Sequence, residues 1–167
     1  MKKFAVVLAL LALLAALPAG AVKPSGGVLP DLSLPDTGGV KHLLRELSAG
    51  KVTLLVYWSV TCPVCVQEMP HLMNLARDFA GNPFRMLLVS GDEPAMKQAV
   101  AAYAAQQKLP QPWLLDLGPT DSMPLADAFS VGATPTIMVV NRAGKVVFTA
   151  EGHVKMDVLR VAVEKAF

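Results

Sequence analysis

The sequence predicts an α/β domain with a mixed central sheet that is covered by helices on both faces. Apolar segments of strand length, at residues 51–58 and 84–90, alternate along the chain with longer segments of helical character. Strands that are apolar throughout are typical of a sheet buried on both faces. Two further apolar segments, 135–140 and 145–150, flank the turn at 141–144 and predict a hairpin, which makes the sheet mixed.

The first 21 residues have the pattern of a secretory signal peptide. Lys2 and Lys3 precede an apolar run from Phe4 to Leu17, which is shorter than the roughly 20 residues that a membrane-spanning helix needs. Small residues at 19–21 provide a cleavage site. We therefore expect cleavage after Ala21, with an uncleaved membrane anchor as the alternative.

Composition limits the remaining possibilities. The 167 residues fit one domain, and with 53% hydrophobic and 17% charged residues the chain is not of the disordered class. The 15 basic and 13 acidic residues include the two lysines of the predicted signal peptide, so the mature chain has no net charge and no nucleic-acid partner is expected. Residues 22–28, rich in Pro and Gly, predict a linker, and 29–167 form the folded domain.

The sequence of the first half of the domain predicts two strands and two helices. A short strand near 31–34, a turn at 36–39 and a short helix near 43–47 come first. Residues 51–58 combine β-branched and aromatic residues without a break and predict the central strand. A helix is expected from 63 to 80, because Gly81, Asn82 and Pro83 follow it.

The second half alternates in the same way. After the buried strand at 84–90, a helix is expected over 92–109, with Asp92 and Glu93 in its first turn and Lys108 in its last, in agreement with the helix macrodipole. A short strand at 112–116 and a short helix at 124–130 precede the hairpin. The closing helix at 154–167 has an apolar side, which consists of Met156, Leu159, Val163 and Ala166.

Both cysteines lie in the segment WSVTCPVCVQEMP, residues 58–70. Pro63 suits the first position of a helix, where its missing N–H costs nothing, and this makes Cys62 the capping residue. The Cys62 sulfur then faces the free amides of Val64 and Cys65. These donors and the helix dipole stabilise a thiolate and should lower its pKa. Cys62 is therefore the predicted nucleophile, and Cys65, one turn inward, is the resolving thiol.

A disulfide with a purely structural role is not favoured for this pair. Two cysteines three positions apart close a very small loop, which removes little entropy from the unfolded chain. Export would place the pair in a compartment where disulfides form.

Glu68 belongs to the same predicted helix. At 100° per residue it lies about 60° from Cys65, on the flank of the apolar side. A partly desolvated carboxyl group there could move a proton to or from Cys65 during exchange. The alternative is a glutamate that extends to solvent, and periodicity alone does not decide between the two.

Thr134 and Pro135 stand at the entrance of the strand predicted at 135–140. A cis bond between them would turn the Thr134 backbone toward a neighbouring loop and leave it free to pair with an extended peptide. The alternative is a trans proline at the start of an edge strand, which is the commoner case.

These motifs resemble the thioredoxin superfamily and, within it, the exported TlpA/ResA-like thiol–disulfide oxidoreductases. The similarity covers residues 29–167. It rests on the strand that ends in Tyr57 and Trp58, on the cysteine pair followed by Glu68-Met69-Pro70, and on the segment VGATPTIMVVNRAGKVVFTAEGH. The resemblance implies a thioredoxin-like fold with an N-terminal strand extension. LLVSGDEPAMKQAV and LPQPWLLD resemble the helix and strand that this subgroup inserts.

The resemblance also implies roles for single residues. Cys62 would attack and Cys65 would resolve, Glu68 would lie near the active-site cavity, and Pro135 would be cis with Thr134 facing the dithiol. Glu68 would replace the buried aspartate of ordinary thioredoxins, whose position Val56 occupies here, and Pro70 would kink the helix. Neither a metal nor another cofactor is implied. The residues expected to border the substrate site are Trp58, Pro63, Val64, Thr134 and Pro135.

Two positions depart from the family pattern. Thr61 stands where many relatives have a tryptophan, which leaves the partner undetermined. Between the cysteines, Pro63 and Val64 leave no histidine to stabilise the thiolate, which favours a reducing or moderate potential.

The leading hypothesis is a periplasmic or otherwise extracytoplasmic enzyme that reduces disulfides of other exported proteins. It would be soluble after signal cleavage, or anchored to the membrane without it, and would act as a monomer. The resemblance implies cytochrome c maturation clients. A membrane thiol donor of the DsbD type would have to re-reduce the enzyme, because the compartment is oxidising.

The alternatives to this hypothesis are metal binding and peroxide reduction. A thioredoxin-like module could bind Cu(I) through its two thiolates. A closed zinc site needs four ligands, and none of the three histidines has ligand spacing to the cysteines. A thiol peroxidase would resemble P-x-x-x-T/S-x-x-C, but Leu55 and Trp58 stand seven positions before the two cysteines.

Overall fold

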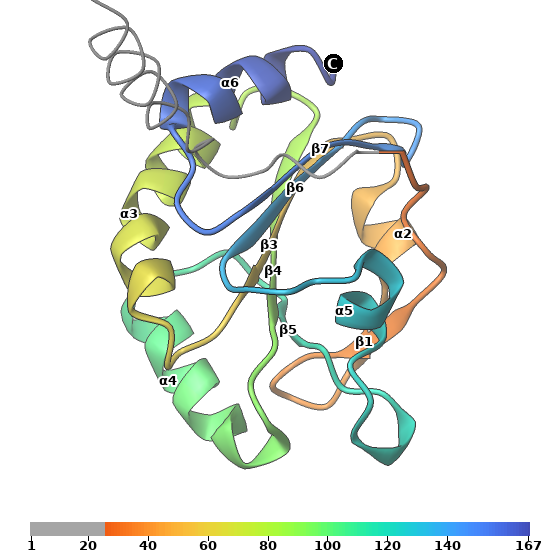
Figure 1. Cartoon of the computed structure of the whole chain (residues 1–167), viewed down its shortest axis with the longest axis vertical. Helices are drawn as coiled ribbons and strands as arrows, with labels where there is room; N and C mark the ends of the chain where they lie inside the picture. Colours follow the sequence, from red (N-terminus) through yellow and green to blue (C-terminus); the bar gives the residue numbers. More distant parts are fainter. Residues whose placement is uncertain (1–25) are drawn as a thin grey trace, which may run out of the picture.

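A five-stranded mixed sheet forms the centre of the protein (Figure 1). The computed structural model describes residues 26–167, so the predicted signal peptide and residues 22–25 of the predicted linker lie outside the described residues. The strand order is β5-β4-β3-β6-β7. β3 pairs in parallel with β4, which pairs in parallel with β5, while β6 is antiparallel to both β3 and β7. The strands are β3 (Val52–Trp58), β4 (Phe84–Ser90), β5 (Trp113–Leu115), β6 (Thr136–Val140) and β7 (Val146–Glu151).

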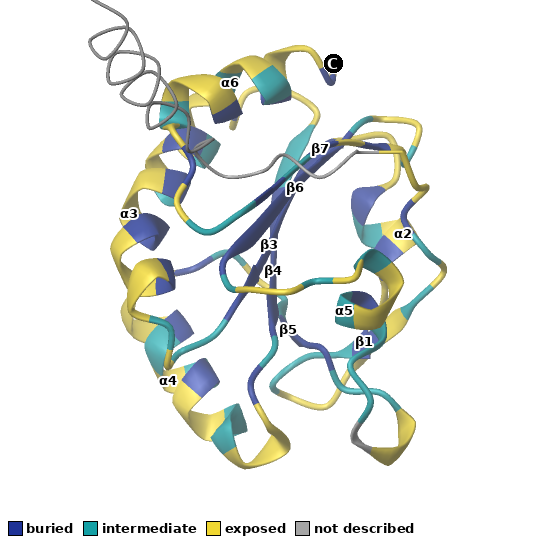
Figure 2. Ribbon diagram, in the orientation of Figure 1, coloured by how far each residue is buried: buried dark blue, intermediate teal, exposed yellow. Residues whose placement is uncertain are grey.

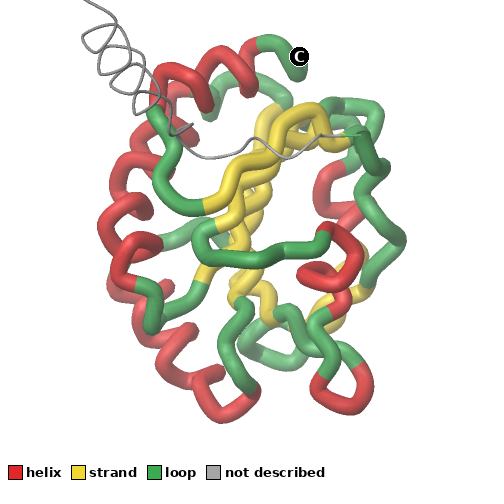
Figure 3. The backbone as a smooth tube through the Cα atoms, in the orientation of Figure 1, coloured by secondary structure: helices red, strands yellow, loops and turns green. Residues whose placement is uncertain are grey.

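Helices cover both faces of this sheet, as the sequence predicts (Figures 1 and 3). One face carries α3 (Pro63–Asp78), α4 (Lys97–Gln106) and α6 (Met156–Glu164). The other face carries α2 (Leu44–Ser48) and α5 (Pro124–Phe129). Two short 3₁₀ turns, Pro94–Met96 and Pro119–Asp121, lie in the connections.

The core consists of two clusters, one on each side of the sheet. Every residue of β3 is buried (Figure 2). Successive side chains point to opposite faces because of the pleat. Leu55 and Tyr57 pack with α2 and α5. The other cluster contains Cys65 and the apolar sides of α3, α4 and α6, and from β3 it receives Val52, Leu54, Val56 and Trp58.

The N-terminal part of the domain forms a small antiparallel sheet. β1 (Ser33–Pro35) pairs with β2 (Lys41–Leu43), which is a strand that the sequence analysis missed. The Asp36 carboxylate accepts hydrogen bonds from the amides of Gly38 and Val40 and thereby closes the turn between the strands. The Thr37 amide donates to the Trp113 carbonyl oxygen at 3.0 Å, which ties this extension to β5.

The predicted helix at 92–109 is wrong at both ends. The α-helical part begins at Lys97 and ends at Gln106. Asp92 and Glu93 precede it, because the Asp92 side chain bonds to other parts of the chain. Lys108, expected in the last turn, lies beyond the helix with φ 53°. The ends of α3 and α6 are likewise shorter than predicted, and Pro70 lies inside α3.

The described end of the predicted linker docks on the hairpin turn. The Val146 amide donates to the Gly27 carbonyl oxygen, and the Leu29 amide donates to the Gly144 carbonyl oxygen. Among residues 26–167, no helix has both the length and the apolar character that crossing a bilayer requires.

Candidate active site

The dithiol lies at the start of α3, where Cys62 is the capping residue as predicted. Pro63 is the first helical residue, and the Cys62 backbone is extended, with φ −90° and ψ 108°. The Cys65 amide donates to the Cys62 sulfur at 3.1 Å. This is the usual bond from the third helical amide to a capping side chain. The Val64 amide, also expected as a donor, is not among the donors to this sulfur.

The two cysteines form a disulfide and differ in exposure. Their Cα atoms are 5.3 Å apart, which suits a disulfide across one helical turn. Cys62 is half-buried, whereas Cys65 is 1% exposed and belongs to the core cluster below α3. Only the first sulfur is therefore positioned to meet another protein.

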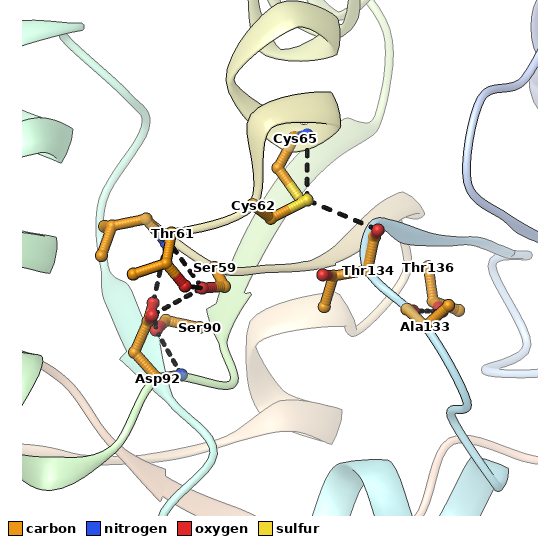
Figure 4. The surroundings of a disulfide bond; sticks show 10 residues. Ser59, Thr61, Cys62, Cys65, Ser90, Asp92, Ala133, Thr134 and Thr136 are labelled. Atoms are coloured by element: carbon orange, nitrogen blue, oxygen red, sulfur yellow. Dashed lines mark hydrogen bonds between the residues drawn. A yellow bond between two sulfur atoms is a disulfide. The ribbon is translucent and has the colours of Figure 1, made fainter.

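Thr134 lies directly beside this disulfide. Its peptide bond to Pro135 is cis, as the resemblance implies. The Thr134 carbonyl oxygen is 3.4 Å from the Cys62 sulfur (Figure 4). Thr136 donates from its hydroxyl to the Ala133 carbonyl oxygen at 2.6 Å, which holds the loop in place. The alternative of an edge strand is wrong, because β6 lies between β3 and β7.

The other predicted substrate contacts divide into two groups. Pro63 and Val64 are exposed at the tip of α3, where they can meet a partner. Trp58 is 1% exposed and packs against Tyr103 with ring centroids 5.3 Å apart. The expectation that Trp58 contacts substrate is therefore wrong in this structure. Trp58 belongs instead to the core cluster that also contains Cys65.

Glu68 is buried, which excludes the alternative of a glutamate that extends to solvent. The residue is 7% exposed, one helical turn after Cys65. Its Oε1 atom is 2.5 Å from Nδ1 of His153, whose side chain is 70% exposed. No hydrogen bond from a described residue reaches the second oxygen, Oε2, which is also buried. Sequence reasoning missed His153, because 85 positions separate the two residues and no spacing connects them.

Asp92 is a second buried carboxylate that sequence reasoning did not assign to the site. It is 6% exposed and accepts hydrogen bonds from the Ser59 hydroxyl at 2.6 Å, the Val60 amide at 3.0 Å and the Ser90 hydroxyl at 2.7 Å (Figure 4). Ser59 also bonds to the side chain and the amide of Thr61. This network holds the segment that leads into Cys62. The signal in the sequence was the presence of polar residues directly after two neighbouring parallel strands.

A third buried carboxylate lies on the other face of the sheet. Asp116 is 0% exposed and accepts from the amides of Leu125 and Ala126, the first two free donors of α5. Burial raises the pKa of Asp116, while these two hydrogen bonds oppose the increase. Burial also raises the pKa of Tyr57, and the negative charge of Asp116 adds to that effect. This pair supports the helix from which the chain continues to Thr134.

The structure bears on the two other functions considered above. In residues 26–167, no three side chains of His, Cys, Asp or Glu gather as a metal ligand set would. Leu55 and Trp58, at the positions where the peroxidase pattern requires proline, are both buried inside β3. Neither of these two observations on the described residues favours metal binding or peroxide reduction.

Comparisons with known proteins agree with this geometry. The AhpC/TSA family model matches residues 26–149. The thiol-disulfide oxidoreductase ResA of Bacillus subtilis is 32% identical over 127 residues, which are 76% of this chain and 67% of that protein. ResA of Halalkalibacterium halodurans is 30% identical over 114 residues, which are 68% of this chain and 61% of that protein. The chain thus spans less than two thirds of the length of this second relative.

A solved structure extends the comparison to the fold. The thioredoxin domain of a thiol-disulfide oxidoreductase from Bacteroides vulgatus matches with a TM-score of 0.71 at 24% identity, over 86% of this chain and 97% of that chain. This match confirms the thioredoxin-like fold predicted from the sequence.

Proposed function

The chain belongs to the AhpC/TSA family, and from this premise we propose that it is a thiol–disulfide oxidoreductase that works through Cys62 and Cys65. One observation carries the proposal. A half-buried sulfur caps α3, accepts the Cys65 amide, and is joined to a second sulfur in the core. Such a position stabilises the thiolate, which is the form that attacks disulfides. Relatives whose names state this activity support the assignment.

The proposed reaction reduces a disulfide in another protein in two exchanges. The Cys62 thiolate attacks one client sulfur, so that a mixed disulfide forms and the other client sulfur leaves as a thiolate. The Cys65 thiolate then attacks the Cys62 sulfur. The bond to the client breaks, the second client thiolate leaves, and the Cys62–Cys65 disulfide forms. Two electrons have passed to the client, and the enzyme is left in the oxidised form that the structure shows.

The surface around Cys62 suits an extended client segment. The Thr134 carbonyl oxygen, 3.4 Å from the Cys62 sulfur, can accept a backbone N–H of such a segment. Val64, 39% exposed, and Pro63 provide apolar contact on the other side of the sulfur. Together they would align the client disulfide with the attacking thiolate.

Glu68 would serve the second exchange. Cys65 must lose its proton before it attacks, and it is buried away from water. Side chains three residues apart on a helix lie next to each other, which places the Glu68 carboxylate beside this thiol. We expect the carboxylate to accept the proton when Cys65 attacks and to return it when the enzyme is reduced again.

The reducing direction and the location outside the cytoplasm complete the proposal. The signal-peptide pattern of residues 1–21 supports export, and the absence of a histidine between the cysteines favours a reducing or moderate potential. In the periplasm, a membrane dithiol donor of the DsbD type would re-reduce the protein. Cytochrome c precursors are the proposed clients, and the protein would act as a monomer.

A redox titration tests the central claim. The purified protein is equilibrated in buffers with a graded ratio of reduced to oxidised glutathione, and the fraction of the Cys62–Cys65 disulfide is counted by mass after acid quenching and alkylation. A single reversible transition of two electrons is expected, together with reduction of insulin disulfides. Cys62→Ser should abolish both the redox transition and the reduction of insulin. A disulfide that does not form and break reversibly would refute the proposal.

Trapping identifies the clients. Cys65→Ser keeps the attacking sulfur but removes the thiol that releases the client, so mixed disulfides should accumulate through Cys62. The variant is expressed in the host, and the adducts are separated with and without reductant. The double variant Cys62→Ser/Cys65→Ser is the matched control and should capture none of them. Capture of cytochrome c precursors would support the proposed clients, and a set of adducts without them would refute that part.

A further inference from the structure

We propose that His153 is the solvent-side partner of Glu68, a positioning residue that orients this carboxylate and carries its proton to and from water. The inference rests on the function proposed above and extends it to a residue outside the dithiol motif. It depends on the contact between the two side chains, on their unequal exposure and on the unpaired oxygen of Glu68.

Glu68 is shielded from bulk water. A carboxylate that is 7% exposed cannot readily exchange protons with bulk water through its own surface. Its Oε1 atom, however, is 2.5 Å from Nδ1 of His153, and 70% of the histidine side chain is exposed. Imidazole can take up a proton at one ring nitrogen and release another from the second. The pair therefore connects a buried carboxylate to the solvent through one side chain.

The second carboxylate oxygen of Glu68 faces the interior. Oε2 of Glu68 is buried and receives no hydrogen bond from the described residues in this oxidised form. An unpaired buried acceptor is unfavourable. Cys65 lies one turn earlier on the same helix face, and in the reduced protein its S–H is a donor that the disulfide lacks. Oε2 of Glu68 would thus bond to the Cys65 thiol, while Oε1 contacts His153.

The backbone fixes His153 in this position. Gly152 has φ 74°, a left-handed conformation that glycine adopts without strain, and this turns the chain at the end of β7. The Gly152 amide donates to the Pro135 carbonyl oxygen at 2.7 Å. The loop that carries His153 is therefore tied to the loop that carries Thr134, so both are held in register with the dithiol.

Other charged groups of the surrounding elements are engaged elsewhere or lie in solvent. Glu151 accepts the Gly132 amide at 2.9 Å, and Arg160 of α6 pairs with Asp78 of α3. Lys155, and His71 on α3 itself, are exposed. Among the described contacts, His153 is the titratable side chain that meets the Glu68 carboxylate.

The proton path follows from this arrangement. When Cys65 attacks the mixed disulfide, its S–H proton passes to Glu68, the new bond joins the Cys65 and Cys62 sulfurs, and the client sulfur leaves as a thiolate with the bond electrons. His153, in the tautomer that carries its proton on Nε2, then takes up this proton at Nδ1, after rotation of the Glu68 carboxyl group has brought it from the Oε2 side to the Oε1 side, and the Nε2 proton leaves to water. Re-reduction reverses these transfers.

A two-phase experiment tests His153 separately from the dithiol. The reduced full-length protein is mixed rapidly with dithiobis-nitrobenzoate, whose coloured thiolate is released once when Cys62 attacks and again when Cys65 resolves. The first phase depends on reagent concentration, and the second is intramolecular. Both are followed as a function of pH in the wild type, His153→Gln, Glu68→Gln and the double variant. His71→Gln, which changes an exposed histidine of α3, is the matched control.

The expected result is selective. His153→Gln should slow the second phase about tenfold and change its pH profile, which is less than the roughly 10²–10⁴-fold that an acid–base group itself contributes. The first phase should stay unchanged, and the double variant should be no slower than Glu68→Gln, because both residues act on one path. His71→Gln should match the wild type in both phases.

Three outcomes would overturn the inference. The first is a second phase in His153→Gln with the wild-type rate and pH profile. The second is an equal slowing of both phases, which would show a general disturbance of the site. The third is a wild type that releases no second thiolate, which would remove the proposed function itself and the relay with it. Urea unfolding of each variant verifies that the fold is retained.

Discussion

Replacing Asp116 with alanine should destabilise the fold while leaving the chemistry of the dithiol intact. The Asp116 carboxylate is 0% exposed and accepts the amides of Leu125 at 2.8 Å and Ala126 at 2.9 Å. Met123, which precedes α5, makes no capping hydrogen bond with its side chain, and Pro124 at the first helical position has no N–H to donate. The Asp116 carboxylate thus caps α5 from outside the helix. Alanine at position 116 would leave the amides of Leu125 and Ala126 without this acceptor.

The magnitude follows from the burial of these two amides. An unsatisfied buried donor costs about 1–3 kcal/mol, and a lost cap costs about 0.5–2 kcal/mol. Leu125 is fully buried, whereas Ala126 is half-buried and its amide can turn to water. The Leu125 amide would therefore carry the full cost of an unsatisfied donor, and the Ala126 amide a part of it. We expect Asp116→Ala to lower the free energy of unfolding by about 2–3 kcal/mol.

Urea unfolding followed by circular dichroism measures this loss. With a slope of about 1–3 kcal/mol/M, the midpoint should fall by about 0.7–3 M. Asp127→Asn is the matched control, because Asp127 is exposed on the same helix, and a surface change of this kind stays within about 0.5 kcal/mol. A loss for Asp116→Ala no larger than that of the control would refute the reasoning.

Three further predictions concern other parts of the molecule. Gly91→Ala should cost about 1–3 kcal/mol in urea unfolding, because the new Cβ would lie 2.3 Å from the hydroxyl oxygen of Tyr57, which is buried and cannot move aside; unchanged stability would contradict this contact. Since burial raises the pKa of Tyr57, the folded protein keeps a proton that the unfolded chain loses above about pH 10. Through this group, stability should then fall by about 1.4 kcal/mol per pH unit. Tyr57→Phe should remove that part of the slope in unfolding curves at alkaline pH, while the part due to Tyr103, whose pKa burial also raises, remains. In the reduced protein, Cys62 should be alkylated near neutral pH well before Cys65, as peptide mass analysis would show; equal rates would contradict their assigned roles.

Three buried carboxylates lie in the segments that surround the active site, each in different surroundings. Asp92 holds the segment before Cys62, Glu68 lies below Cys65, and Asp116 supports the helix that leads to Thr134. None of them belongs to the cysteine motif in the narrow sense. Buried carboxylates are seldom retained without partners, and each of these three is hydrogen-bonded to a residue of another part of the chain.

Local pattern was enough for the elements and for the dithiol. Near neighbours in the chain are enough to define the unbroken apolar run of β3, the break at Gly81 and the proline after Cys62, because they fix strand faces and helix caps directly. The burial of Glu68 could be predicted only in part. Periodicity placed the residue on the flank of the apolar side of the helix but did not show which segment would cover it.

Contacts between distant segments were decided by the tertiary structure alone. His153 contacts Glu68 although 85 positions separate them. Asp92 bonds to Ser59 and does not lie in the first turn of α4, where the sequence predicted its negative charge. Helical and strand periods relate residues only a few positions apart, whereas these pairs depend on strand order and on the path of connecting loops. The sequence by itself determined the dithiol at a helix tip and the doubly covered sheet. The packing of β6, β7 and α3 decided which side chains surround the sulfurs, because only the closed sheet brings those loops together.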